Sequence, residues 1–307
     1  MSGGDATIVP MRVAVIDVGS NTARLLVAQV DVNGSVVPVA EERRYLRLGA
    51  EIERTGTIGK KKIAATAGVC ATYARRAASL GAVRTTVIVT APGRQGASAP
   101  ALTAALAEAT ALPVRVLTAD TEGRLAYDGA LARATGGLPD VIAVVDVGGG
   151  STEVAVGTPA LGAAWVRSAD LGSLRLTRAH LYDDPPTARQ VAAASRAVAG
   201  ALEDMSPPSP VLALAVGGSA RALAKVIGRR FDADDIGEAV ALLSRRPAVK
   251  AARTFGISAE RAETLLAGAL LLAGVSQVLG VSLELGRGGL REGAALELAT
   301  VEAVRAA

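Results

Sequence analysis

The chain has 307 residues, 50% of them hydrophobic, and a formal net charge of +4. This length suffices for two ordinary domains with full cores, and the mild positive charge excludes the strongly basic class of proteins that coat nucleic acid. A single cysteine, Cys70, excludes an internal disulfide framework, and a single histidine, His180, excludes a Cys/His zinc cluster.

Residues 1–10 lack the basic and then apolar pattern of a secretory signal, and we expect them to form a disordered tail. The longest apolar run, at 265–275, is shorter than the ~20 residues that a membrane span needs. The sequence therefore predicts a cytoplasmic protein without a membrane or nucleic-acid partner.

The first half begins with apolar runs rich in β-branched residues, which predict strands, and then alternates between strands and helices. Asn33-Gly34 predicts a hairpin turn between the second and third strands. We expect strands at 12–18, 23–30, 35–44, 85–90 and 114–117, and helices at 60–80, 99–110 and 121–133. This order is typical of α/β layers with mixed strand direction.

The second half repeats the opening of the first. We expect strands at 141–146, 153–156, 162–168 and 211–216, and a Gly-rich strand-like segment at 282–289. Helices are predicted at 171–181 and 187–204, from Gly217 onward, in three stretches between 235 and 279, and at 290–305.

One motif occurs in both halves. Residues 13–22 and 142–152 each contain a short apolar run, then an aspartate (Asp17 or Asp146), then a Gly-rich turn that ends in hydroxyl residues. Backbone N–H groups in such a turn can cradle phosphate oxygens, whereas a carboxylate beside phosphate repels it unless it holds a cation or orients a water. The repeat therefore indicates two related domains whose loops face one cleft outside the strand ends and close on a phosphate and a metal ion.

The residues of these loops are the candidate ligands. Asp17 and Asp146 would hold Mg²⁺, which typically takes one or two carboxylates together with phosphate oxygens; the alternative is a strand-end aspartate that only starts a turn. The candidate phosphate-binding residues are Gly19, Ser20, Asn21, Thr22, Gly148, Gly149, Gly150, Ser151, Thr152, Gly217, Gly218 and Ser219. Ligand-free turns and an ordinary helix start are the alternatives for these residues.

Five blocks in the same order resemble the exopolyphosphatase and guanosine pentaphosphate phosphatase (Ppx/GppA) family. Residues 17–22 and 146–153 resemble its two phosphate loops, and the other blocks lie at 45–49, 120–125 and 290–293. The resemblance implies an α/β fold of the two-lobed actin-like ATPase (ribonuclease H-like, ASKHA) type, with duplicated domains and an interdomain cleft. Lobe I would comprise 11–124 and a last helix at 291–305, and lobe II would comprise 125–290, as in the short form without C-terminal helical domains.

The resemblance also implies chemistry. Family members use Mg²⁺ to hydrolyse terminal phosphates of inorganic polyphosphate, or the 5′ phosphate of guanosine pentaphosphate. Glu122 would then be the general base that takes a proton from the attacking water, Arg94 would bind a substrate phosphate through paired N–H groups, and Glu153 would order water or metal. Without the resemblance, Glu122 reads as a helix N-terminal carboxylate, and Arg94 and Glu153 read as exposed surface residues.

We therefore expect an exopolyphosphatase that uses water directly and forms a homodimer, as the family often does. Guanosine pentaphosphate hydrolysis, a non-hydrolysing sensor of either anion, and a kinase of the same fold are the alternatives. Two departures from the family pattern, Thr121 and Ser98, are compatible with the sensor. The basic clusters at 60–62, 229–230 and 245–246 are interpreted mainly as solvated helix ends, with guidance of a long anion as the alternative.

Overall fold

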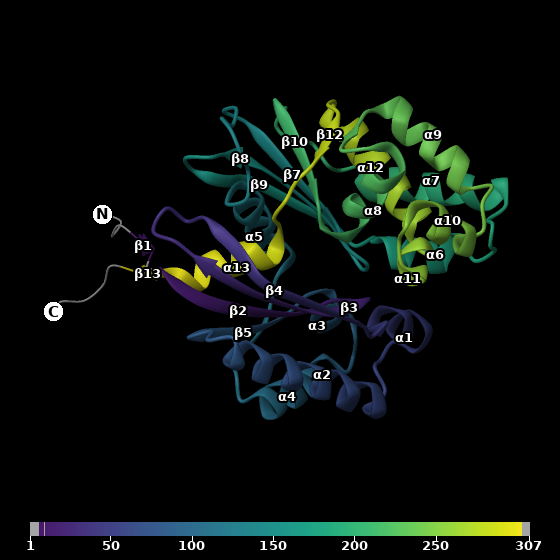
Figure 1. Cartoon of the computed structure of the whole chain (residues 1–307). Helices are drawn as coiled ribbons and strands as arrows, with labels where there is room; N and C mark the ends of the chain where they lie inside the picture. The colour runs from purple at the N-terminus through teal and green to yellow at the C-terminus, as the bar shows by residue number, and fades with distance from the viewer. Residues whose placement is uncertain (1–5, 9, 303–307) are drawn as a thin grey trace.

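The computed structural model describes residues 6–8 and 10–302, and it contains two mixed β-sheets with helices on their faces (Figure 1). In spatial order, the first sheet consists of β4 (Val36–Tyr45), β3 (Thr22–Val30), β2 (Met11–Val18), β5 (Arg84–Val89) and β6 (Val114–Val116). The second consists of β11 (Arg230–Phe231), β12 (Leu283–Leu285), β10 (Leu212–Val216), β7 (Ile142–Val147), β8 (Thr152–Thr158) and β9 (Gly162–Ala169).

The two sheets share one plan. In the first, β2, β3 and β4 are antiparallel, and β2 then pairs in parallel with β5, which pairs in parallel with β6. In the second, β7, β8 and β9 are antiparallel, and β10 pairs in parallel with both β7 and β12. The register places Asp17 opposite Arg24 in one sheet and Asp146 opposite Glu153 in the other. The duplicated α/β architecture predicted from the repeated motif is therefore confirmed.

Helices cover the outer faces of both sheets. Those following the first three strands are α1 (Leu48–Thr55), α2 (Lys60–Ser79), α3 (Ala91–Gln95) and α4 (Ala99–Thr110). Those of the second half are α6 (Ser173–His180), α7 (Ala188–Leu202), α8 (Gly217–Ile227), α9 (Ala233–Leu243), α10 (Ala248–Phe255), α11 (Ala259–Ala262) and α12 (Leu265–Leu279). Because aromatics make up only 2% of the chain, both cores are packed mainly by Ala, Val, Leu and Ile.

Two further helices, α5 (Ala119–Leu131) and α13 (Leu290–Ala299), lie between the two sheets (Figure 1). Helix α13 packs on β2 and β3, whereas α5 packs on β7, β8 and β9. The two helices cross at glycines: a Cβ at Gly129 would collide with the carbonyl of Gly289, and one at Gly293 would collide with the carbonyl of Leu125. This close backbone approach needs residues without side chains, and it fixes the two sheets relative to each other.

The structure differs from the sequence-based expectations at several places. The last helix ends at Ala299 rather than at 305, because the chain turns extended and β13 (Thr300–Glu302) pairs with β1 (Ala6–Ile8). The expectation of a disordered tail over 1–10 is therefore wrong for Ala6–Ile8, and residues 1–5, 9 and 303–307 lie outside the described residues. The lobe boundary expected between 124 and 125 falls inside α5.

Besides β1 and β13, three short elements, α1, α3 and β11, were not predicted, and the stretch between 235 and 279 contains four helices rather than three. Each of these short segments depends on tertiary contacts rather than on sequence periodicity. Within the described part of the chain, no helix is both long and apolar enough to cross a bilayer.

Candidate active site

The two Gly-rich loops adopt the same turn. The Gly19 N–H donates to the Thr22 carbonyl at 2.9 Å, and the Gly148 N–H donates to the Ser151 carbonyl at 3.0 Å. Each turn follows a strand whose penultimate residue is an aspartate and leads into the antiparallel partner strand. Both loops line one cavity of about 110 Å³, and both Asp17 and Asp146 are in its wall. The structure thus brings together the two motifs that lie about 130 residues apart in sequence.

Most of the residues predicted for the site line this cavity, which we call the cleft cavity. They are Asp17, Gly19, Ser20, Asn21, Thr22, Glu122, Asp146, Gly148, Gly149, Gly150, Ser151, Gly217 and Gly218. The loops also lie close to each other, because a Cβ at Gly149 would lie 3.4 Å from the Ser20 Cβ, and one at Gly150 would lie 2.5 Å from the Ser20 Oγ. The cleft is therefore narrow where the two loops meet.

Four of the predicted residues are not in the cavity wall. Thr152 donates its hydroxyl to the Leu171 carbonyl at 2.7 Å, and Ser219 donates its hydroxyl to the Val147 carbonyl at 2.9 Å. Both hydroxyls are buried in the fold, so the phosphate contacts predicted for them have no support in this geometry. Arg94 and Glu153 also lie behind the wall, where they surround Glu122.

Helix α5 presents Glu122 to the cavity from its first turn. Thr118 is the N-cap, and its hydroxyl oxygen accepts the Thr121 N–H at 3.1 Å, which satisfies one of the free N–H groups of a helix start. The Thr121 hydroxyl lies 2.8 Å from the Thr118 hydroxyl. Thr121, where the family pattern often has an acid, thus belongs to the cap that fixes the position of Glu122.

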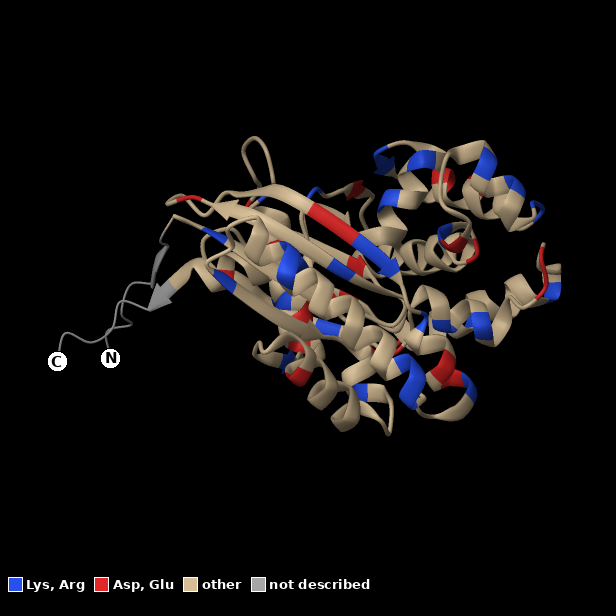
Figure 2. Cartoon of the chain, turned by 60° about the horizontal axis from the view of Figure 1, so that its bottom comes forward, with Lys and Arg blue, Asp and Glu red and all other residues tan. Residues whose placement is uncertain are grey.

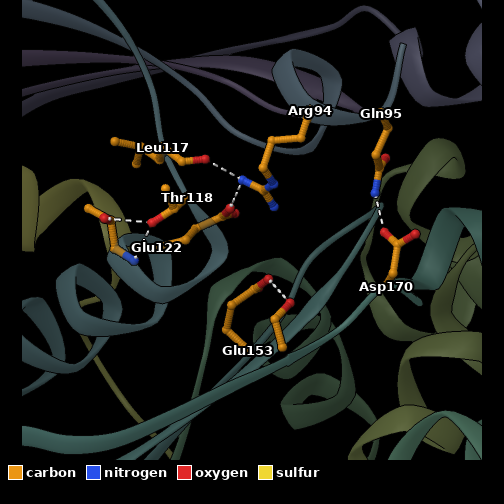
Figure 3. A network of polar contacts seen from close by, with 9 residues as sticks. Arg94, Gln95, Leu117, Thr118, Glu122, Glu153 and Asp170 are labelled. Carbon is orange, nitrogen blue, oxygen red and sulfur yellow. Dashed lines mark hydrogen bonds and ion pairs between the residues drawn. The ribbon is translucent and has the colours of Figure 1, made fainter.

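Arg94 holds the Glu122 carboxylate rather than facing open space. Its Nη1 donates to Glu122 Oε2 at 2.8 Å and to the Leu117 carbonyl at 2.7 Å, as Figure 3 shows. Glu122 is 9% exposed, so this ion pair is largely shielded from water. The direct phosphate contact predicted for Arg94 is replaced in this structure by a contact that orients the carboxylate.

Glu153 provides the second carboxylate of this region. Its Oε1 accepts the Ser168 hydroxyl at 2.9 Å, and the side chain is buried (Figure 3). Burial and the charge of Asp146 raise the pKa of Glu153 to about 7, against hydrogen bonds from Ser151 and Ser168 that lower it. Burial, then the charge of Glu153, raise the pKa of Glu122 well above its usual range, against the opposing effect of Arg94.

The pKa values of the two loop aspartates are also raised. Burial raises the pKa of Asp17 to about 6, although Arg24 and Arg291 oppose the shift, and burial also raises the pKa of Asp146. Asp17 Oδ1 is buried and makes no hydrogen bond to any of the described residues. A buried carboxylate oxygen without a partner is unfavourable unless a cation or a donor reaches it.

Sequence reasoning missed five charged residues of the cavity wall: Arg24, Arg221, Arg261, Arg291 and Glu292. Burial, then repulsion from Arg291 and Arg221, lowers the pKa of Arg24 to about 9, and burial also lowers the pKa values of Arg221 and Arg261. Guanidinium groups held this close together and out of water are stabilised by an anion that comes between them. Arg24 could have been inferred from the predicted pairing of the first two strands, because that pairing places it opposite Asp17.

Arg291 bonds to residues of the first sheet. It is 4% exposed, and its Nη2 donates to Glu41 Oε1 at 2.7 Å while Nη1 donates to the Leu25 carbonyl at 3.3 Å. These bonds attach the start of α13 to the first sheet. The adjacent Glu292 is also buried and lines the cavity. The block at 290–293 therefore places one cation and one anion at the floor of the cleft.

Polar contacts also join the two halves at the outer side of the cleft. Arg175 Nε lies 2.7 Å from Glu53 Oε1, and the Tyr45 hydroxyl lies 2.9 Å from the Ser258 hydroxyl. Arg47 pairs with Glu263 at 3.3 Å, and Gln95 donates to Asp170 (Figure 3). Each pair joins a residue of the first sheet's half to one of the second, so the structure is that of a closed cleft.

The chain was compared with known proteins. The model of the Ppx/GppA phosphatase family matches residues 26–302. Exopolyphosphatase 1 of Mycobacterium tuberculosis is 31% identical over 313 residues, which cover 95% of this chain and 90% of that protein. The chain also matches Exopolyphosphatase 2 of the same organism, with 36% identity over 201 residues, 62% of each chain.

Solved structures agree. The crystal structure of the Aquifex aeolicus Ppx/GppA family member matches with a TM-score of 0.79 and 26% identity over 94% of this chain and 97% of that one. An exopolyphosphatase from Cytophaga hutchinsonii matches in fold, with a TM-score of 0.83 at 18% identity over 94% and 97% of the two chains. The predicted two-lobed actin-like fold is confirmed. With matches of this extent in sequence and in structure, the chain belongs to the Ppx/GppA phosphatase family.

Proposed function

We propose that this chain is an exopolyphosphatase, which hydrolyses the terminal phosphoanhydride bond of inorganic polyphosphate and releases orthophosphate. The observation that carries the proposal is the composition of the cleft cavity. The buried carboxylate of Glu122 shares a cavity of about 110 Å³ with two Gly-rich loops and with four arginines, Arg24, Arg221, Arg261 and Arg291. A site of this kind suits a terminal phosphate together with a water held beside it.

Glu122 is the general base of the proposed reaction. A base must be ionised to accept a proton, and its strength increases with its pKa, so the best pKa lies near the working pH. Burial and Glu153 raise the pKa of Glu122, while Arg94 opposes the rise and keeps a charged partner 2.8 Å from the carboxylate. Arg94 therefore acts as a positioning residue that fixes the direction in which Glu122 points.

The loops and the arginines bind the phosphate groups. N–H groups and hydroxyls of Ser20, Asn21, Thr22 and Ser151 lie in the cavity wall and can donate to phosphate oxygens. Arg24 and Arg221 supply positive charge where the bridging oxygen becomes a leaving group. Because these donors are fixed by the fold, little reorganisation is needed during the reaction.

Asp17 and Asp146 fit a magnesium ion that is shared with the substrate. Within the described residues there is no group of three or more acidic, His or Cys side chains that could hold a metal alone. Mg²⁺ often binds through one or two carboxylates together with substrate phosphates, and Asp17 Oδ1 lacks a partner in the cavity wall. When bound, the ion would neutralise phosphate charge and help to align the terminal phosphoryl group.

The proposal is tested by a substrate panel. Long polyphosphate, tripolyphosphate, guanosine pentaphosphate and ATP are incubated with the purified chain in Mg²⁺ or in EDTA, and orthophosphate release is measured. We expect Mg²⁺-dependent release from both polyphosphates, at a higher kcat/KM than from guanosine pentaphosphate.

The other outcomes identify the alternatives. Binding of polyphosphate without release would identify a sensor. A preference for guanosine pentaphosphate would assign the chain to the other activity of the family, and ADP formation that depends on an acceptor would identify a kinase.

A further inference from the structure

We propose that a groove on α10 and the loop that precedes it binds the distal part of a long polyphosphate chain whose end lies in the cleft cavity. The groove is lined by Arg245, Arg246, Pro247, Lys250, Arg253 and Thr254, and we call it the distal groove. This inference rests on the proposed function. It adds a second binding site for the same substrate, outside the residues that perform the reaction.

The distal groove is cationic and free of acidic side chains. Four of its six lining residues are Lys or Arg, and none of the six is acidic. Arg245, Lys250 and Arg253 are exposed, and no ion pair of these four cations occurs among the described residues. Figure 2 shows both basic and acidic segments on the helices of the second half; the acidic residues of α9, Asp234, Asp235 and Glu238, are outside the lining of the groove.

One cation of the groove is held in place by the fold. The Arg246 guanidinium lies 5.8 Å from the centre of the Phe255 ring, and its Nη1 donates to the Thr254 hydroxyl at 3.2 Å. Such stacking restricts the side chain, so that less rotamer freedom is lost when an anion binds.

The distal groove shares Arg246 with a second pocket, and that pocket includes a residue of α11. This pocket is also lined by Arg178, by Ala262 and by three acidic residues, Asp183, Asp184 and Glu263. Ala262 is adjacent in the chain to Arg261, which lines the cleft cavity. The short helix α11 therefore lies between the second pocket and the cleft cavity. It faces α1 across the cleft (Figure 1).

The positive charge of the distal groove and its position relative to the cleft cavity together indicate a long polyanion as its ligand. A chain that carries a negative charge on each phosphate can leave the cleft past Arg261 and meet Arg178, Arg246 and then Lys250. The acidic residues of that pocket all have partners. Glu263 is paired with Arg47 at 3.3 Å, Asp183 accepts a side-chain N–H of Gln190 at 2.7 Å, and Asp184 accepts the Ala248 N–H at 2.8 Å. Tripolyphosphate is too short to occupy both sites, so the groove should affect long chains only.

The test compares two triple variants with wild type. Arg245→Gln/Lys250→Gln/Arg253→Gln removes three exposed cations of the groove and leaves Arg246 on its ring. The matched control, Arg75→Gln/Arg229→Gln/Arg230→Gln, removes three exposed cations elsewhere. KM and kcat are measured for long polyphosphate and for tripolyphosphate at low and high salt, and unfolding midpoints confirm that both variants are folded.

We expect the groove variant to raise KM for long polyphosphate about ten-fold at low salt, and to leave both constants for tripolyphosphate within two-fold of wild type. The difference should shrink at high salt, since exposed charges are screened. The control should leave KM for long chains unchanged.

Several results would overturn the inference. They are an unchanged KM of the groove variant for long chains, an equal rise in the control, or an equal rise for tripolyphosphate. Loss of RNA binding with unchanged polyphosphate kinetics would assign the surface to nucleic acid instead. If wild type releases no phosphate from either substrate, the proposed function fails; labelled long polyphosphate, followed by anisotropy, then tests the groove by binding alone.

Discussion

Replacing Asp17 by asparagine should stabilise the protein at neutral and alkaline pH. The pKa of Asp17 is raised from 3.8 to about 6, chiefly by burial. In the unfolded chain the carboxyl ionises near its ordinary value, so the folded state binds the proton more tightly. The contribution of this group to stability is therefore present below about pH 4 and is lost as the pH rises through about 6.

The size of the effect follows from the shift. A change of about two pKa units corresponds to about 3 kcal/mol, at ~1.4 kcal/mol per unit. Asparagine has nearly the same shape and cannot ionise. We expect Asp17→Asn to raise the free energy of unfolding at pH 8 by up to about 3 kcal/mol, and to change it little at pH 4.

Urea unfolding at pH 4, 6 and 8 in EDTA measures this difference, with the exposed Asp140 replaced by asparagine as the control. Addition of Mg²⁺ and orthophosphate at pH 8 should stabilise wild type and not Asp17→Asn, because a ligand stabilises the state that binds it. A variant that is less stable than wild type at pH 8, or whose difference from wild type does not change with pH, would refute the assignment of Asp17 as a carboxylate held without a partner.

Three further predictions concern the base and the crossing of the two central helices. Glu153→Gln removes the like charge that raises the pKa of Glu122, so the acid limb of the pH profile of kcat/KM should move to lower pH. Arg94→Gln removes the opposing cation, so the same limb should move to higher pH and kcat should fall about 100-fold; shifts in the same direction would contradict both assignments. Gly129→Ala should destabilise the protein by about 3 kcal/mol or more in urea unfolding, because its methyl group would collide with a backbone carbonyl. The matched Gly237→Ala, in open space on α9, should stabilise it by about 0.5–1 kcal/mol, and equal effects would exclude the steric explanation.

Two kinds of element could be predicted from the sequence: those that occur in both halves, and those that bury apolar residues at regular spacing. Helix α4 has the predicted bounds, 99–110, and the main strands of both sheets are within a few residues of those expected. The two aspartate loops were predicted to face one cleft, and they line one cavity. These features follow from local turn chemistry and from a duplication that is visible in the residues themselves.

Other parts of the site depend on long-range contacts. Arg94 was expected to bind phosphate, but its Nη1 lies 2.8 Å from Glu122, and sequence alone does not show that two segments 28 residues apart meet in this way. The hydroxyls of Thr152 and Ser219 could in principle donate to a phosphate, but in the structure each donates to a backbone carbonyl instead. Arg221 lies one turn into α8 and has no signature that separates it from an exposed helix arginine.

The proposed function depends on Glu122 accepting the proton of the attacking water. The most direct measurement is orthophosphate release from tripolyphosphate by Glu122→Gln, with the exposed Glu238→Gln as the matched control. We predict a fall in kcat of about 10²–10⁴-fold for the first variant, a KM within a few-fold of wild type, and no change for the second. Turnover of Glu122→Gln at the wild-type rate would contradict the account.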